Sequence, residues 1–239
     1  MKIQIISDLH LDNWRYETDE DMEKLVEPVG DVLVIAGDLA VDKNKLGAQF
    51  IDFYKSQFKS VIYIPGNHEH YGSWFVEENI QFHNIIDNTH YMNNAVVFVD
   101  NVRFLCSTLW SGVTKTAMNY INDYQCISGF DMIMENYVHA FSVGWLKREL
   151  MKKYSGPTVV VTHHLPLWEC VSPRFVGNIA NAAFVSDQSR LFDNSIDLWI
   201  HGHSHDYSEV TYKGISVVRN PCGYPHETLN FQNNFFKEV

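Results

Sequence analysis

Acidic, imidazole and amide side chains follow five apolar runs of this chain, and their types are those that can do metal chemistry. No Lys or Arg stands among them. They are Asp8 and His10, Asp38, Asn67 and His68, His163 and His164, and His201 and His203. Carboxylate, imidazole and amide oxygen without thiolate favour first-row ions such as Mn, Fe or Zn over a thiolate-type structural zinc site.

These side chains are too many for one ion. Two ions about 3.5 to 4 Å apart that share a carboxylate would use them all. Such a pair polarises phosphoryl oxygens, lowers the pKa of a bridging water into the neutral range and stabilises an in-line displacement. Each residue alone has an ordinary explanation, because Asp after Gly is a common turn former and a lone His at a strand end is usually structural. Their succession at five positions favours the metal centre.

The residues have to be positioned by buried strands, since each follows a short β-branched run. In open α/β sheets, ligands bind beyond the carboxyl ends of the strands. The runs at 3–6, 32–36, 61–64, 158–161 and 196–200 are predicted strands. Helical spacing predicts helices over 19–26, 43–58, 74–86 and 132–153, and a short helix starting at 186–189. The alternation at the N-terminal end indicates a βαβαβ unit with right-handed crossovers.

A second, antiparallel sheet is predicted to begin near residue 95. The runs 95–99 and 102–106 are predicted to form a hairpin, as are 210–212 and 215–219. Two long stretches, 107–131 and 168–186, have no sustained period and are interpreted as functional, lid-like loops.

The composition of the chain reduces the number of possible functions and locations. The chain of 239 residues carries 18 basic and 29 acidic residues, a net charge of -11, which argues against binding long nucleic acid through its phosphates. The four cysteines form no Cys-x-x-Cys pair. No signal-peptide pattern and no membrane-length apolar stretch is present, so we expect a cytoplasmic protein.

The motif blocks resemble the calcineurin-like metallophosphoesterase superfamily in type and order. They are Asp8-x-His10, Gly37-Asp38, Gly66-Asn67-His68-Glu69, His163, and Gly202 flanked by His201 and His203. Asn122-Asp123-Tyr124 and Thr108-Leu109-Trp110-Ser111 resemble a bacterial and phage subgroup of small single-domain phosphoesterases. The resemblance implies one domain over residues 1–239, folded as an α/β four-layer αββα sandwich of two mixed β-sheets flanked by helices.

The resemblance also implies residue roles. Asp8, His10 and His203 would hold one metal, and Asn67, His163 and His201 the other. Asp38 would bridge the two ions. His68 would face the leaving group and donate a proton or stabilise the transition-state charge.

An imidazole near two cations needs an acidic partner to stay protonated, and Asp42 and Glu69 are the candidates for His68. The serine/threonine phosphatase branch of the superfamily has this acid three residues after the bridging Asp, where this chain has Val41. His164, His205, His70 and Glu69 are interpreted as hydrogen-bond partners of the ligands or as ordinary loop residues.

We therefore expect a dinuclear-metal phosphoesterase that hydrolyses small phosphomonoesters or phosphodiesters of nucleotide or cyclic-nucleotide type, with a metal-bridging hydroxide attacking in line. The alternatives are a nuclease or protein phosphatase of the same superfamily, and a non-catalytic scaffold that uses this fold to bind proteins. A scaffold would be expected to lose ligands, and every expected ligand type is present.

Overall fold

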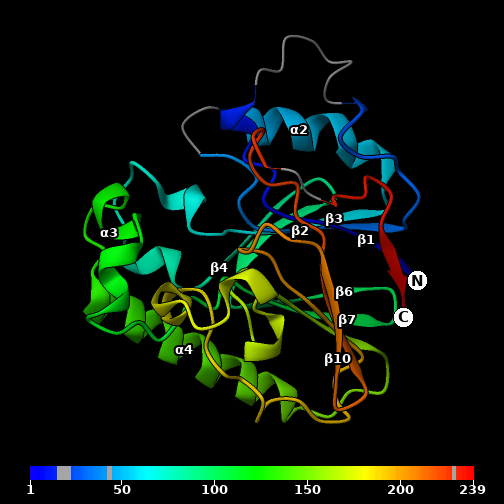
Figure 1. The fold of residues 1–239 in the computed structure, drawn as a ribbon. Helices are drawn as coiled ribbons and strands as arrows, with labels where there is room; N and C mark the ends of the chain where they lie inside the picture. Colours follow the sequence, from blue (N-terminus) through cyan, green and yellow to red (C-terminus); the bar gives the residue numbers. More distant parts are fainter. Residues whose placement is uncertain (15–22, 42–44, 228–229) are drawn as a thin grey trace.

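Two six-stranded β-sheets pack face to face in the computed structural model, which describes residues 1–14, 23–41, 45–227 and 230–239 (Figure 1). The first sheet has the order β12 (Phe236–Glu238), β1 (Lys2–Ile6), β2 (Val32–Ala36), β3 (Ser60–Ile64), β5 (Thr89–Asn93) and β4 (Phe82–Ile86). The second has the order β10 (Ser208–Tyr212), β11 (Ile215–Arg219), β9 (Leu198–Ile200), β8 (Thr158–Thr162), β7 (Val102–Ser107) and β6 (Ala95–Val99). In each sheet the four inner strands are parallel and the two edge strands are antiparallel. The second sheet is therefore mixed, and only its two edge hairpins have the antiparallel pairing that the sequence predicts for the whole sheet.

The inner strands β2, β3, β7 and β8 are buried on both faces, as their largely apolar sequences predict. Alternate residues such as Ile5, Val34 and Ile62 meet Phe104 and Val161 between the sheets. The side chains that alternate with these face outward and are covered by helices.

The helix α2 (Leu46–Tyr54) packs on the outer face of the first sheet through Phe50 and Tyr54. The helix α4 (Met132–Leu150) packs on the outer face of the second sheet through Trp145 and Leu146. Figure 1 shows α2 and α4 on opposite sides of the paired sheets. This arrangement confirms the predicted four-layer αββα sandwich.

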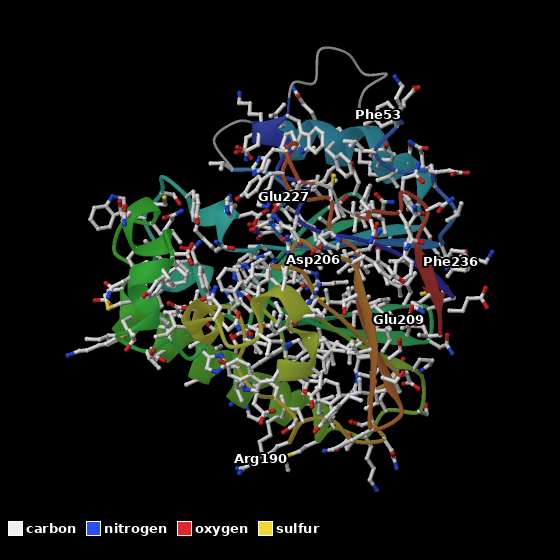
Figure 2. All side chains as sticks on the ribbon, viewed as in Figure 1. Phe53, Arg190, Asp206, Glu209, Glu227 and Phe236 are labelled. Atoms are coloured by element: carbon white, nitrogen blue, oxygen red, sulfur yellow. The ribbon has the colours of Figure 1, made fainter. Side chains whose placement is uncertain are left out.

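Short helices occupy the connections. They are α3 (Asp123–Cys126) and the 3-10 helices Leu11–Asn13, Lys55–Gln57, His68–His70, Glu77–Asn79, Ala117–Tyr120, Trp168–Cys170, Pro173–Phe175 and Ile179–Ala183. With all side chains drawn, the space between the sheets is filled, while Phe53 and Arg190 lie on opposite sides of the molecule (Figure 2). None of the described helices combines the length and the apolarity that a bilayer crossing requires.

The structure confirms the predicted strands, both hairpins and the helices that correspond to α2 and α4. Residues 19–22 of the predicted helix over 19–26 lie outside the described residues, and so do residues 43 and 44 at the start of the predicted helix over 43–58.

The predicted helix over 74–86 is wrong. This segment forms a 3-10 turn and then β4, whose residues pair with β5 from Phe82↔Asn93 to Ile86↔Thr89. The pairing extends the first sheet at its edge, so tertiary context decides against the helical spacing.

The predicted short helix at 186–189 is also wrong. The backbone N–H groups of Ser186 and Gln188 donate to the carbonyls of Leu165 and Pro166, and therefore the segment runs beside the loop after β8. The C-terminal strand β12 was not predicted; it pairs with β1.

Candidate metal centre

The carboxyl ends of strands from both sheets meet at one place. Asp8 follows β1, Asp38 follows β2, Asn67 follows β3, His163 follows β8, and the segment 201–205 follows β9. Backbone hydrogen bonds join neighbouring ends: Asp8 N–H donates to Gly37 O at 3.0 Å, and Gly202 N–H donates to His163 O at 3.0 Å. The five strand ends are therefore positioned by the sheets and by one another.

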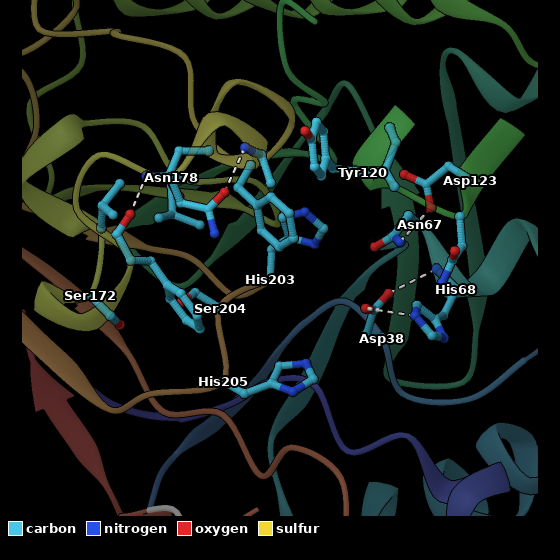
Figure 3. Close-up of a pocket in the computed structure, with 18 of the residues that line it drawn as sticks. Asp38, Asn67, His68, Tyr120, Asp123, Ser172, Asn178, His203, Ser204 and His205 are labelled. Atoms are coloured by element: carbon cyan, nitrogen blue, oxygen red, sulfur yellow. Dashed lines mark hydrogen bonds and ion pairs between the residues drawn. The ribbon is translucent and has the colours of Figure 1, made fainter. Parts of the chain in front are cut away.

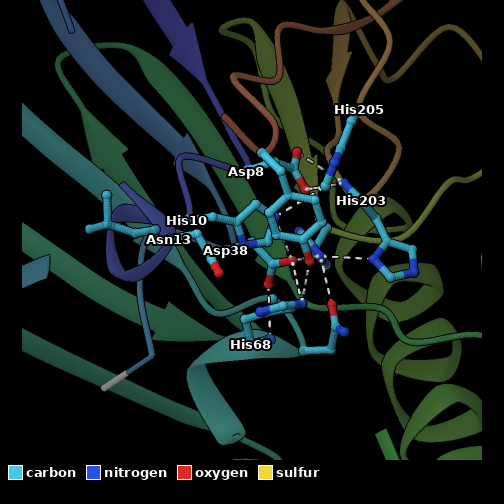
Figure 4. Close-up of polar contacts among 12 residues, drawn as sticks. Asp8, His10, Asn13, Asp38, His68, His203 and His205 are labelled. Atoms are coloured by element: carbon cyan, nitrogen blue, oxygen red, sulfur yellow. Dashed lines mark hydrogen bonds and ion pairs between the residues drawn. The ribbon is translucent and has the colours of Figure 1, made fainter. Parts of the chain in front are cut away.

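Their side chains converge into groups whose ligand atoms all lie within 4.8 Å of one another. One group is Asp8, His10 and His205, and another is Asp38, His163 and His203; a third joins His10 and Asp38 to His68. Figure 4 shows Asp38 at the middle of the arrangement.

Asp38 connects the first two groups. Its Oδ2 lies 3.8 Å from His10 Nε2 and 3.4 Å from His163 Nε2. Asn67 adds an oxygen to the second group, since its Oδ1 lies 3.2 Å from His163 Nε2. A carboxylate between two clusters of nitrogen and oxygen atoms is positioned to contact two cations at once.

The structure brings together all the residues with a predicted metal or catalytic role except His201, and it adds His205 to them. His164 lies beside the site, with its Nδ1 3.3 Å from Thr108 O. His201 belongs to neither group: its backbone N–H still pairs with Val218 O of β11, and its Nδ1 lies 3.1 Å from Gly202 O. His205 Nε2 instead lies 3.1 Å from His10 Nε2 and 3.7 Å from Asp8 Oδ1.

His203 lies in a different group of ligands from the one that the resemblance implies. Its Nδ1 lies 3.1 Å from His163 Nε2, so the ring belongs with Asp38 and His163 rather than with Asp8 and His10. Two imidazoles two positions apart occur both at 201 and 203 and at 203 and 205, and spacing alone does not separate these pairs. Gly202 is the sequence feature that bears on this choice. A Cβ at residue 202 would lie 2.9 Å from Asp8 Oδ2, so the backbone comes closest to the site between His201 and His203.

The backbone at the site is strained. Asp8, His10, Asp38 and His203 have φ of 51°, 44°, 55° and 68°, in the left-handed region that residues other than glycine seldom adopt. Such conformations persist where surrounding contacts enforce them, and they cluster at functional sites.

The electrostatics of the site favour a bound cation. Burial alone would lower the pKa of His163, but the carboxylates of Asp38 and Asp8 raise it to about 10. Burial lowers the pKa of His10 and of His203 well below the ordinary value, so these rings are neutral and have lone pairs to offer. His10 Nδ1 is buried and has no hydrogen-bond partner among the described residues.

The residues therefore fit divalent transition metals. Neutral imidazoles, two carboxylates and an amide oxygen are suitable donors, and the nitrogen pairs about a hydrogen-bond length apart converge on shared points. A metal ion would displace the proton that His163 attracts.

Glu69 joins two loops by hydrogen bonds and is not the acid partner of His68. Its carboxylate accepts hydrogen bonds from the backbone N–H groups of Asp38 (3.1 Å), Leu39 (2.7 Å) and Gly66 (2.6 Å), and from the Tyr63 hydroxyl (2.7 Å). Both oxygens are occupied, so Glu69 does not hold the proton of His68. It fixes the loops after β2 and β3 to each other.

The His68 ring contacts aromatic residues. Tyr71 stacks on it with ring centroids 4.2 Å apart, and the Tyr224 hydroxyl lies 3.4 Å from Nε2. The backbone N–H of His68 donates to Asp38 Oδ1 at 2.9 Å. Asp42, the other candidate partner, lies outside the described residues.

The C-terminal segment supplies contacts that the sequence did not indicate. Glu227 Oε2 lies 2.7 Å from His205 Nδ1, and the Tyr224 ring stacks on His10 with centroids 4.5 Å apart. These residues lie far along the chain from the motifs and in no regular element, so no local pattern marks them.

A cavity of about 300 Å³ opens beside the site. Asp38, His68 and His203 line it, together with residues of both stretches that were predicted to be loops, 107–131 and 168–186. In Figure 3, Asp123 and Asn67 lie on one side and Ser172 and Asn178 on the other.

Comparison with known proteins agrees with this fold. A family model described as calcineurin-like phosphoesterase matches residues 1–207, and the chain therefore belongs to this family. A curated relative, the uncharacterized protein L509 of Acanthamoeba polyphaga mimivirus, is 29% identical over 226 residues, which cover 83% of this chain and 80% of the relative.

A solved structure similar to this chain is that of phosphopantetheinyl hydrolase (PptH) from Mycobacterium tuberculosis. It has a TM-score of 0.68 and 17% sequence identity, and the match covers 94% of this chain and 90% of that one. At this identity the likeness shows the fold.

Proposed function

We propose that this protein is a dinuclear-metal phosphoesterase that hydrolyses small phosphomonoesters or phosphodiesters, of nucleotide or cyclic-nucleotide type, by in-line attack of water. The observation that carries the proposal is the position of Asp38 between two groups of metal-binding side chains. Phosphoesterase chemistry is also what membership of the family favours.

The geometry supports a revised set of ligands. Asp8, His10 and His205 would hold one ion, and Asn67, His163 and His203 would hold the other. Asp38 would hold both ions. Mn, Fe and Zn all suit these donors. When bound, such a pair polarises the phosphoryl oxygens and lowers the pKa of a shared water into the neutral range.

The protein's own residues position the ester and handle the proton. His68 lines the cavity, and its Nε2 lies 4.0 Å from Asp38 Oδ2. From this place the imidazole donates a proton to the leaving oxygen or stabilises charge that develops there. The stacked Tyr71 and the nearby Tyr224 hydroxyl restrict the orientation of the ring.

The cavity favours a substrate with one reacting phosphate and a neutral organic group. Arg174 is the single Lys or Arg among the described residues that line it, and its guanidinium is paired with Asp206 at 2.9 and 3.0 Å. Tyr120 and Phe175 add aromatic surface. Long nucleic acid and polyphosphates lack cationic partners here, so the nuclease alternative is not favoured.

Two sequence-based expectations stay predictions: closure of the stretches 107–131 and 168–186 over the substrate, and a cytoplasmic location. Because PptH is named for a phosphopantetheinyl group, an ester of this kind belongs in the substrate screen together with cyclic nucleotides.

The experiment is a hydrolysis assay with added Mn²⁺. p-Nitrophenyl phosphate and bis(p-nitrophenyl) phosphate are compared with alkyl phosphoesters, in the wild type and in His68→Ala. Since p-nitrophenolate leaves without protonation and an alkoxide does not, the substitution should lower kcat about 10²- to 10⁴-fold for alkyl esters and much less for p-nitrophenyl esters.

The matched control is His83→Ala, which removes an exposed imidazole on β4 away from the cavity and should leave both rates unchanged. An Mn²⁺-loaded wild type that turns over no ester would refute the enzyme and favour the scaffold. Equal losses on the two kinds of ester would refute the proton-donor role of His68.

A further inference from the structure

Asp123 is a buried carboxylate, 4% exposed, in the middle of the long stretch 107–131. It is the first residue of α3 and lies next to Asn67 in the wall of the cavity (Figure 3). Removing a carboxylate from water costs free energy unless hydrogen bonds compensate for the lost hydration. A buried carboxylate in a cavity wall is therefore a candidate for a functional role. No Lys or Arg is paired with it among the described residues, so its contacts are those of neutral donors.

Both donors belong to the active-site loop after β3. Asp123 Oδ1 accepts a hydrogen bond from Asn67 Nδ2 at 2.8 Å and one from the Tyr71 hydroxyl at 2.7 Å. Asn67 Nδ2 also lies 3.2 Å from the Tyr71 hydroxyl. These three groups form one closed network.

The network determines which end of the Asn67 amide faces the metal centre. Asp123 Oδ1 accepts a hydrogen bond from Nδ2, so the NH₂ end of the amide faces Asp123. The carbonyl oxygen then points the other way, to within 3.2 Å of His163 Nε2. With the amide reversed, an NH₂ group would face the cations and supply no ligand.

The same carboxylate acts on the proton donor. It holds the hydroxyl of Tyr71, whose ring stacks on His68 with centroids 4.2 Å apart. Asp123 thus orients an oxygen ligand through one hydrogen bond and the ring that restricts His68 through another.

Asp123 is itself fixed by a docked segment. Gly72 N–H donates to Cys126 O, Ser128 N–H to Ser73 O and Phe75 N–H to Ser128 O, at 2.6, 2.9 and 2.8 Å. This part of the stretch 107–131 is therefore bonded to the chain that follows His68.

We propose that Asp123 is the positioning residue of the centre, which fixes the Asn67 amide with its oxygen toward the metals and makes α3 a part of the active site. The inference rests on the proposed function for its effect on turnover. Its effect on metal binding does not depend on turnover.

The test is Mn²⁺ affinity, measured by titration calorimetry and by the electron paramagnetic resonance signal of coupled Mn²⁺, in wild type, Asp123→Leu and Asp123→Asn. Leu removes the acceptor at similar size, and the second Mn²⁺ should bind about 10- to 100-fold more weakly, with loss of the coupled signal. Asn keeps one acceptor oxygen but no longer dictates the orientation of Asn67, so its loss should be smaller, though more than about threefold.

The control is Asp131→Asn, at the end of the same stretch, where the side chain caps α4 through the N–H groups of Ile133 and Met134 and Asn can keep those bonds. It should bind Mn²⁺ as the wild type does. Wild-type affinity in both Asp123 variants, or in Asp123→Asn if Asp123→Leu does not fold, would overturn the inference.

A wild type that binds two Mn²⁺ and hydrolyses no ester would refute the proposed function, while the affinity comparison would still decide the role of Asp123. A wild type that binds no Mn²⁺ would overturn both.

Discussion

Glu135 of α4 is a buried carboxyl group outside the metal centre, and its replacement by Gln tests how the structure couples stability to pH. The side chain is fully buried and accepts hydrogen bonds from Ser111 Oγ at 3.1 Å and from the Tyr124 hydroxyl. Burial raises its pKa from 4.5 to about 7, although these hydrogen bonds act in the opposite direction. Near neutral pH the folded protein therefore holds a proton that the unfolded chain has lost.

The direction of the change in stability with pH follows from proton binding. Below pH 4.5 the carboxyl is protonated in both states and does not affect folding. Between pH 4.5 and about 7 the unfolded chain gains the free energy of ionisation and the folded protein does not, so stability falls as pH rises. At about 1.4 kcal/mol per pH unit, the full effect is about 3 kcal/mol, of which about 2 to 3 kcal/mol falls between pH 5 and pH 8.

Glu135→Gln mimics the protonated side chain. Urea unfolding followed by tryptophan fluorescence, with EDTA present so that metal binding does not contribute, gives the free energy of unfolding at both pH values. The difference in the free energy of unfolding between the variant and the wild type should shift by about 2 to 3 kcal/mol in favour of the variant from pH 5 to pH 8.

The control Glu149→Gln removes the same charge from the other end of α4, where the carboxylate pairs with Lys152 at 2.7 Å. Its difference from wild type should stay within about 0.5 kcal/mol between the two pH values. A pH-independent difference for Glu135→Gln, or a gain toward low pH, would refute the reasoning.

Two further substitutions test the loops around the site. In Gly66→Ala the new Cβ would lie 2.2 Å from Asp38 Oδ1 and 2.7 Å from His163 Nε2. Elemental analysis should therefore show a lower metal content, while the circular dichroism spectrum stays native. Gly144→Ala, in an open part of α4, is the control. Full metal content in Gly66→Ala would contradict this packing. Glu69→Gln replaces an acceptor oxygen by a donor and opposes two of the four donors, so urea unfolding should show a loss of about 2 to 4 kcal/mol. A loss below about 0.5 kcal/mol would mean that Glu69 does not join the two loops.

The sequence predicts most of the fold because the inner strands are buried on both faces. Runs such as Val32–Ala36 and Thr158–Thr162 are continuous and β-branched, and their helical neighbours α2 and α4 have apolar faces. The sequence of the edge strand β4 predicts a helix instead, because the strand is exposed and its pairing with β5 depends on the rest of the sheet.

The site is predictable to the extent that strand ends determine it. Asp8, Asp38 and Asn67 follow directly from the parallel order of β1, β2 and β3. After β9 the chain leaves the strand with His203 in a left-handed conformation, and which imidazoles then face Asp8 depends on that turn rather than on spacing.

Asp123, Tyr224 and Glu227 reach the site from connections without a regular period. The motif Asn122-Asp123-Tyr124 marks Asp123 in the sequence but does not predict its contact with Asn67, and no local pattern marks Tyr224 or Glu227. Long-range packing of the loops produces these contacts.

The most direct test of the metal centre is the number of transition-metal ions bound per chain, measured by elemental analysis after metal loading and dialysis. Wild type and His201→Ala should each hold two ions, and His205→Ala should hold one, since His205 and not His201 lies with Asp8 and His10. A wild type without bound ions, or a loss in His201→Ala with both ions kept in His205→Ala, would contradict the account.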